Sequence, residues 1–251
     1  MRVQNQHVRI AVAGATNVVG RHVVAELGRR GHETVPLARS EGVDVMRLDG
    51  LADHLAGVDA VIDTLGITTT RRKPATDFFT TTTRNLLQAE GRAGVGRHVL
   101  LSIVGIDGSR FGYYRAKVAQ EDVARTLDTS TTILRATQFH EFAEQMLARA
   151  KAGPVVVVPR MRSATVAASE VAAALVDLAE NPQPGTIEMG GPETHDMPEL
   201  VERVAAARGV RAKVVAVTIP GSAGRTMKDG SLIPKNPWRT GTQTFDEWLR
   251  G

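Results

Sequence analysis

Three residues in the middle of the chain could carry acid–base chemistry. Tyr113 and Lys117 are spaced as Tyr-x-x-x-Lys, and Ser102 lies upstream of them. Because positions i and i+4 of a helix lie together, we expect the ammonium of Lys117 beside the phenol of Tyr113. A nearby cation lowers the pKa of a phenol, as a general acid working near neutral pH requires. The pattern predicts Tyr113 as the acid and Ser102 as a hydrogen-bond partner of a substrate carbonyl; the alternative is a surface Tyr–Lys pair beside a packed Tyr114.

A glycine turn near the N-terminus (residues 14–20, GATNVVG) is expected to bind phosphate. It stands between an apolar run and a helical pattern. Gly14 permits a tight turn, Gly20 permits close packing of helix on strand, and the helix N-terminus offers N–H groups to a pyrophosphate. Asn17 replaces the middle glycine, and we expect it to tolerate a left-handed backbone. Its side chain either crowds the pyrophosphate or hydrogen-bonds to it; the alternative is a glycine-rich turn without a ligand.

The end of the second expected strand distinguishes between two dinucleotides. An NAD site places a carboxylate there to bind the ribose hydroxyls. This chain has Arg39 and Ser40 instead, and a guanidinium fork pairs well with a 2′-phosphate. We therefore expect NADP(H) to be preferred over NAD(H), although a solvated arginine at a strand end is the alternative.

The elements that must position these residues alternate between strand and helix. Apolar runs predict strands at 8–13, 33–38, 43–48, 58–65, 98–104 and 131–135. Helical spacing predicts helices at 18–30, 77–93 and 114–126, and residues 68–75 are interpreted as a surface loop. This alternation is typical of an α/β fold with a Rossmann-like, doubly wound parallel sheet.

The C-terminal third has a different pattern of predicted helices and strands from the rest of the chain. Its helical patterns cover 141–152, 169–180 and 198–208, with short strands expected near 155–158, 186–189 and 213–218. We interpret residues 1–251 as a single domain in which residues 139–251 contribute most of a small C-terminal cap on the substrate side. The alternative is that this region simply extends the main domain.

Composition excludes several classes of protein. The chain has 251 residues, 42% hydrophobic and 23% charged, as in an ordinary globular protein. It has no cysteine, and its histidines lack metal-ligand spacing, so we expect no disulfide and no metal site. A net charge of +4, mixed along the chain, and only 4% aromatic residues argue against nucleic acid as a partner. Because no apolar run is long enough to span a membrane, we expect a cytoplasmic protein. We expect its partner to be a small-molecule substrate.

The sequence resembles the short-chain dehydrogenase/reductase superfamily and, within it, the atypical NmrA-like NAD(P)-binding branch. The resemblance spans residues 8 to about 178. It rests on Arg39, on Asp49 and on four segments: AGATNVVG (13–20), LSIVGID (101–107), YYRAK (113–117) and ILRATQFHEF (133–142).

That resemblance implies a Rossmann fold and a set of cofactor-binding residues. NADP(H) is expected at the glycine turn, which includes Thr16, Val18 and Val19, and at Arg39. Asp49 is expected near the adenine, and Leu65 and Gly66 are expected to give backbone contacts. The nicotinamide is expected near Ser102, Lys117 and Thr137.

Three functions stay open. The first is an NADP(H)-dependent oxidoreductase that reduces a small carbonyl or quinone-like substrate through Ser102, Tyr113 and Lys117. Many atypical members lack a working tyrosine, so a non-catalytic NADP(H)-binding sensor that regulates a partner is the second. An epimerase that acts through transient oxidation is the third. His140 follows the sixth expected strand and could contact substrate, whereas a partly buried structural histidine is the alternative.

Overall fold

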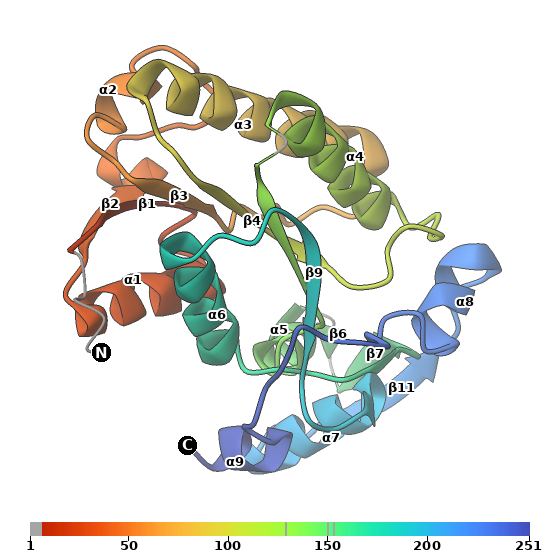
Figure 1. Ribbon diagram of the computed structural model, residues 1–251. Coiled ribbons are helices and arrows are strands. Elements are labelled where there is room, and N and C mark those ends of the chain that lie inside the picture. Colours follow the sequence, from red (N-terminus) through yellow and green to blue (C-terminus); the bar gives the residue numbers. More distant parts are fainter. Residues whose placement is uncertain (1–6, 129, 150, 153) are drawn as a thin grey trace.

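The computed structural model describes residues 7–128, 130–149, 151–152 and 154–251, and its centre is a parallel sheet (Figure 1). The strands of this sheet are β1 (Arg9–Ala13), β2 (Glu33–Leu37), β3 (Ala60–Asp63), β4 (His98–Ile103), β5 (Thr132–Ala136), β9 (Gly185–Gly190) and β12 (Arg239–Thr240). They lie in the order β12-β9-β5-β4-β3-β1-β2, and every neighbouring pair is parallel. The chain leaves β1 for β2 on one side and then crosses to β3 on the other. Open sheets of this kind bind ligands at the carboxyl ends of their strands, beside such a reversal of direction.

Helices cover both faces of the sheet, which explains why its inner strands β1, β3, β4 and β5 are mainly apolar and buried. Helices α1 (Val18–Arg30) and α6 (Ala168–Glu180) pack on one face, and α2 (Leu51–His54), α3 (Arg72–Ala93) and α4 (Gly112–Leu127) lie on the other (Figure 1). Successive residues of β4 point to opposite faces, so Val99 joins the core beneath α6 and Leu100 packs against α4. The predicted doubly wound α/β fold is thereby confirmed.

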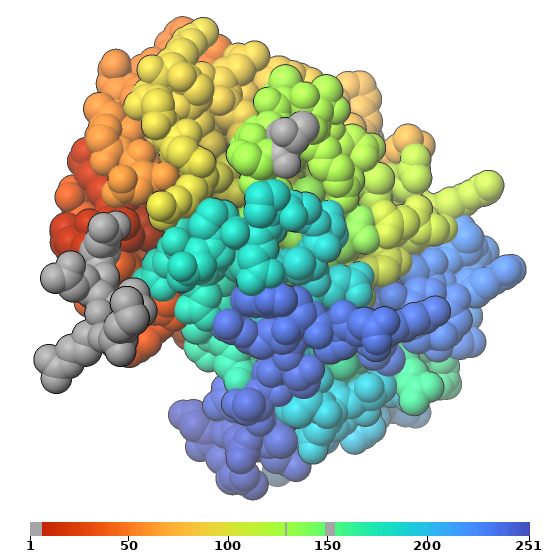
Figure 2. Space-filling model, in the orientation of Figure 1, coloured from red at the N-terminus to blue at the C-terminus, as the bar shows by residue number. Residues whose placement is uncertain are grey.

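The C-terminal region builds a second, smaller core beside the sheet. Its elements are α5 (Glu141–Arg149), α7 (Met197–Ala207), α8 (Gly221–Lys228), α9 (Phe245–Arg250), a three-stranded sheet of β6 (Lys151–Ala152), β7 (Val155–Pro159) and β11 (Lys213–Val217), and a two-stranded sheet of β8 (Arg162–Ser163) and β10 (His195–Asp196). Buried side chains of these elements form one cluster, centred on β7 and α7. Figure 2 shows the C-terminal residues, in blue, across the lower part of the molecule. Strands β9 and β12 belong to the central sheet, and α6 packs against it. Residues 139–251 are therefore shared between the cap and the central sheet with its helices.

The strand expected at 43–48 is absent, and that prediction is wrong. After β2 the chain forms a 3-10 turn, η1 (Arg39–Glu41), and then an irregular segment. Val43 and Val45 are buried in alternation, as a strand would bury them. However, Asp44 accepts a hydrogen bond from the N–H of Met46 at 3.1 Å, and the carbonyl of Val45 accepts one from Asn85 of α3 at 3.1 Å. These backbone groups are used by a turn and by a side chain, so no ladder forms.

Helix α3 begins within the segment that the sequence pattern assigns to a loop. The loop prediction for 68–75 is wrong from Arg72 onwards. Pro74 lies in the first turn of α3, where its missing N–H removes no intrahelical hydrogen bond. The proline therefore does not prevent the helix from starting early.

Neither a membrane span nor a metal cluster is found among the residues that the structure describes. No helix within these ranges is long and apolar enough to cross a bilayer. In the same part of the chain, no three His, Cys, Asp or Glu side chains lie close enough together to hold a metal ion.

Candidate active site

The glycine turn joins the end of β1 to the start of α1. Gly14 has a φ of +82°, in the left-handed region that favours glycine. A Cβ on Gly20 would lie 2.1 Å from the carbonyl oxygen of Gly14, so only glycine lets the helix approach the turn this closely. The structural roles that the sequence predicts for these two glycines are therefore confirmed.

Asn17 caps helix α1 and does not adopt a left-handed backbone. Its φ is −79° and its ψ is 179°, so the turn does not need the left-handed tolerance of asparagine at this position. Its Oδ1 accepts a hydrogen bond from the N–H of Gly20 at 2.7 Å, and its Nδ2 donates one to the carbonyl oxygen of Thr64, just beyond β3, at 2.6 Å. The side chain therefore fixes the start of the helix and ties the turn after β1 to the turn after β3.

The first turn of α1 keeps backbone N–H groups that an anion could accept. The N–H of Gly20 is taken by Asn17, whereas those of Val18 and Val19 have no acceptor among the described residues. The first turn contains no acidic residue, so the positive end of the helix dipole faces no carboxylate. Thr16, which precedes the cap, is exposed. This end of the helix fits a pyrophosphate.

Arg39 and Asp49 are both exposed after the end of β2. Arg39 is exposed at the start of η1, directly after the end of β2, and its guanidinium makes no ion pair within the described ranges. Asp49 is exposed in the loop before α2 and lines a hollow of about 300 Å³ together with Asp44, Arg47 and other residues of 42–54. Arg39 is not among the residues that line this hollow.

Of the other expected cofactor contacts, the backbone at Gly66 is accessible, whereas the hydroxyl of Thr137 already has a partner in the protein. The N–H of Leu65 donates to Asp63 at 2.9 Å, and the neighbouring Gly66 is exposed, with nothing within 4 Å of a Cβ placed on it. The backbone after β3 is therefore accessible to a ligand. Thr137, after β5, is buried, and its hydroxyl donates to the carbonyl of Ala164 at 2.5 Å. That hydroxyl joins the cap to the sheet.

Phe79 brings Tyr113 and Lys117 together. The ring centroids of Phe79 and Tyr113 are 5.4 Å apart in an edge-on arrangement, and Nζ of Lys117 lies 4.7 Å from the centroid of the Phe79 ring. Lys117 also donates hydrogen bonds to the carbonyl of Leu101, at 2.7 Å, and to Oε1 of Gln120. The two residues therefore share one face of α4, as their spacing predicts.

Burial, rather than a neighbouring charge, sets the pKa values of this pair. Burial raises the pKa of Tyr113 to about 12. Burial lowers the pKa of Lys117 to about 8, although Asp63 and Glu121 act in the opposite direction. The expectation that Lys117 lowers the pKa of Tyr113 is wrong for this structure, because the ammonium is turned to the carbonyl of Leu101 and the amide of Gln120. The phenol is protonated at neutral pH.

A buried carboxylate that the sequence pattern does not predict holds Ser102. The hydroxyl of Ser102 donates to Oε1 of Glu121 at 2.6 Å, and both side chains are buried. Arg135 of β5 donates to the same carboxylate at 2.9 and 2.6 Å, and then to Asp107 at 2.6 and 2.7 Å. Burial alone would raise the pKa of Glu121, but the hydrogen bonds from Arg135 and Ser102 hold it below its usual value. The hydroxyl of Ser102 therefore donates its proton to a protein side chain.

A second buried polar chain holds Lys117. Asp63 of β3 is fully buried, and its Oδ2 accepts weak hydrogen bonds from Gln120 at 3.3 Å and from Thr83 at 3.4 Å. Gln120 in turn accepts from Lys117. A charged residue within an apolar strand is the sequence signal that could have revealed both networks, since such a residue needs a partner. Asp63 in β3 and Arg135 in β5 are the two examples.

His140 is a structural residue of the cap. It is buried, with Nδ1 3.0 Å from the hydroxyl of Thr165 and Nε2 3.1 Å from the carbonyl of Gln243. Its ring meets that of Phe245 edge-on at 5.4 Å. Burial lowers its pKa, so the imidazole is neutral near pH 7. Both ring nitrogens have partners, which favours the structural alternative over the expected substrate contact.

Solved structures with this fold include two that hold NADP or NAD. A dTDP-4-dehydrorhamnose reductase from Bacillus anthracis str. Ames in complex with NADP has a TM-score of 0.77 at 14% identity, over 98% of each chain. A short-chain dehydrogenase/reductase superfamily protein from Agrobacterium tumefaciens with bound NAD has a TM-score of 0.67 at 21% identity, over 96% of this chain and 95% of that one. A UDP-N-acetylglucosamine 4-epimerase from Bacillus cereus has a TM-score of 0.66 at 20% identity, over 84% and 87%. At these identities the likeness shows the fold.

The family follows from a match to the chain itself. Among curated proteins, none matches it significantly. The model of a family described as NAD(P)H-binding matches residues 14–182, more than half of the chain. This segment begins at Gly14 and includes the whole Tyr113–Lys117 face, whereas the NmrA-like branch stays a prediction. The match shows that the chain belongs to the NAD(P)H-binding family, on a fold shared with short-chain dehydrogenases/reductases.

Proposed function

We propose that this protein is an NADP(H)-dependent oxidoreductase that reduces a small carbonyl or quinone-like substrate. The observation that carries the proposal is the shared contact of Tyr113 and Lys117 with Phe79, which places a phenol and an ammonium on one face of α4. The reductase and the epimerase with a similar fold support an enzyme of this general type.

The residues around the glycine turn fit a dinucleotide. The positive φ of Gly14 and the N–H groups of Val18 and Val19 suit the pyrophosphate, and the open backbone at Gly66 lies after the neighbouring strand. Arg39 is exposed without an acidic partner in the described part of the chain, and no carboxylate follows β2 directly. These features support NADP(H), because a guanidinium binds a 2′-phosphate that NAD(H) lacks.

The side chains divide the remaining chemistry between them. The nicotinamide cofactor, when bound, supplies the hydride. A carbonyl oxygen that becomes an alcohol needs a proton, and the phenol of Tyr113 carries one at neutral pH because burial raises its pKa to about 12. Two of the three N–H groups of Lys117 are held by Leu101 and Gln120, which leaves one for a ribose hydroxyl.

The test is steady-state oxidation of NADPH with a panel of carbonyl and quinone substrates. We expect Tyr113→Phe to bind NADPH as the native protein does, but to turn over roughly 10²- to 10⁴-fold more slowly, the usual contribution of a positioned acid. Tyr114→Phe is the matched control, because it removes a hydroxyl one residue away. Turnover by Tyr113→Phe close to that of the native protein would contradict this assignment.

A non-catalytic NADP(H)-binding sensor is the second candidate. One observation favours it: the Ser102 hydroxyl donates to Glu121, so its proton is not offered to a substrate. A sensor binds NADPH but oxidises it with no member of the panel. Titration of NADPH beside the kinetic panel therefore separates the two candidates.

A further inference from the structure

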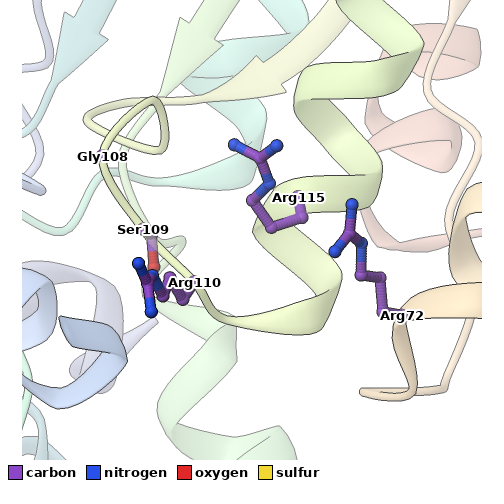
Figure 3. A pocket seen from close by; sticks show the side chains of 5 residues that line it. All are labelled: Arg72, Gly108, Ser109, Arg110 and Arg115. Atoms are coloured by element: carbon purple, nitrogen blue, oxygen red, sulfur yellow. The ribbon is translucent and has the colours of Figure 1, made fainter. Parts of the chain in front are cut away.

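A hollow at the start of α4 is lined by arginines that the proposed reaction does not use. Its lining residues are Arg72 at the start of α3, Gly108, Ser109 and Arg110 of the β4–α4 loop, and Arg115 of α4 (Figure 3). Its volume is about 540 Å³, which lies within the usual range for small-molecule sites. We call it the arginine hollow.

The arginine hollow is separate from the glycine turn and from the Tyr113–Lys117 face. Arg115 lies two residues from each of Tyr113 and Lys117, which places it on the opposite side of α4. None of the residues that line the hollow belongs to the glycine turn or follows β2. A ligand there would not compete with the dinucleotide for its binding residues.

The three guanidinium groups have no acidic partners. Within the described ranges, Arg72, Arg110 and Arg115 form no ion pair and no side-chain hydrogen bond, and all three are exposed. The nearest acid along the loop is Asp107, whose carboxylate is taken by two hydrogen bonds from Arg135 that lower its pKa. Like charges lining one hollow repel one another, so an anion placed among them is stabilised.

Two helix N-termini meet beside these arginines. A Cβ on Gly112 would lie 2.5 Å from the carbonyl oxygen of Thr70 and 2.9 Å from the backbone nitrogen of Arg72, so the chain segments that begin α3 and α4 are in contact. Neither helix has an acidic residue in its first turn or a side chain that caps it. Both positive dipole ends therefore act in the same direction as the arginines.

A buried hydroxyl completes the lining. Ser109 is only 1% exposed, and its Oγ accepts a hydrogen bond from the N–H of Phe111 at 3.2 Å. The hydroxyl proton itself has no acceptor among the described residues. A buried O–H without an acceptor favours an acceptor-rich ligand at the site.

We propose that the arginine hollow binds the phosphate or pyrophosphate group of a small molecule, independently of the dinucleotide at the glycine turn. Phosphate oxygens accept paired hydrogen bonds from the planar fork of arginine, and they carry the negative charge that this site lacks. The group belongs to a phosphorylated ligand other than the carbonyl substrate of the proposed function, because Arg115 lies on the opposite side of α4 from Tyr113.

The direct test is calorimetric titration of inorganic pyrophosphate into the full-length protein saturated with NADP⁺. Saturation keeps pyrophosphate away from the glycine turn. We expect binding to persist, and to weaken at least about tenfold in Arg110→Gln and in Arg115→Gln, as the loss of one charge-assisted contact predicts. Gly108→Glu keeps all the arginines but adds a carboxylate, and a Cβ there meets nothing within 4 Å; it should weaken binding as well. Arg84→Gln, an exposed arginine of α3 outside the hollow, is the control.

Three results would overturn the proposal: no pyrophosphate binding in the presence of NADP⁺, equal weakening by Arg84→Gln, or no effect of the three variants at the hollow. A pair of substrates, glyceraldehyde and glyceraldehyde 3-phosphate, then tests the source of the phosphate. We expect Arg110→Gln to leave both KM values unchanged; a KM raised for the phosphorylated aldehyde only would overturn the assignment to a separate ligand. Because calorimetry needs no turnover, the test of pyrophosphate binding stays valid even if the proposed reaction fails.

Discussion

Replacement of Asn17 separates stability from cofactor binding. Asn17→Ala removes the cap bond to the N–H of Gly20, at 2.7 Å, and the bond to the carbonyl of Thr64, at 2.6 Å. Replacing an N-cap by alanine costs about 1 kcal/mol, and a partly buried hydrogen bond contributes about 1 kcal/mol more. We therefore expect Asn17→Ala to lower the free energy of unfolding by about 2 kcal/mol.

Asn17→Asp affects stability less than it affects cofactor binding, because aspartate keeps the oxygen that caps α1. It loses the N–H that Thr64 accepts, but it gains about 0.3–1 kcal/mol from a negative charge at the N-terminus of α1. We expect it to be more stable than Asn17→Ala. NADPH should nevertheless bind at least about tenfold more weakly, equivalent to ~1.4 kcal/mol, because the new carboxylate lies beside the N–H groups of Val18 and Val19 that suit the pyrophosphate.

Urea unfolding at pH 7, followed by circular dichroism, measures the free energy of unfolding. Titration followed by nicotinamide fluorescence measures the affinity for NADPH. A native-like urea midpoint with an unchanged m value in Asn17→Ala would show that the two hydrogen bonds do not stabilise the fold. Native-like NADPH affinity in Asn17→Asp would refute the assignment of the α1 N-terminus to the pyrophosphate.

Three further predictions concern single positions. Gly20→Ala should lower the melting temperature and abolish NADPH binding, because its Cβ would lie 2.1 Å from the carbonyl oxygen of Gly14; an unchanged melting curve would contradict the close packing. Arg39→Ala should weaken NADPH binding about ten- to a hundredfold without changing that of NADH, and equal affinities for both cofactors in the native protein would contradict this. The pKa of Lys117 is about 8 in the folded protein, against an ordinary value of 10.5 for an exposed lysine. Between these values the unfolded chain binds a proton that the folded chain lacks, so stability should rise with pH there by up to about 3 kcal/mol. Lys117→Met should remove that rise, as urea midpoints at pH 7.5 and 9.5 would show.

The parts of the site that the sequence predicts are those that depend on backbone geometry. Gly14 must accept a positive φ, and Gly20 must let two backbone segments touch, so residue type alone identifies both positions. The inner strands β1, β3, β4 and β5 are predictable for a similar reason, because burial on both faces favours a mainly apolar run, whereas the short edge strand β12 carries no such signal. The 43–48 segment shows the limit of this reasoning. Val43 and Val45 alternate as in a strand, but the carbonyl of Val45 binds Asn85, a residue of α3 distant in sequence.

The Tyr113–Lys117 face shows why spacing predicts neighbours but not their partners. The i, i+4 rule places Tyr113 and Lys117 together, yet what lies opposite a helix face depends on residues brought in from other elements. Arg135 comes from β5 and binds Glu121 in α4, and that carboxylate then takes the hydroxyl of Ser102. A charge inside the apolar run of β5 requires such a partner. While the Arg135–Glu121 pair persists, the Ser102 hydroxyl serves the fold, so the proposed reaction relies on Tyr113 for its acid.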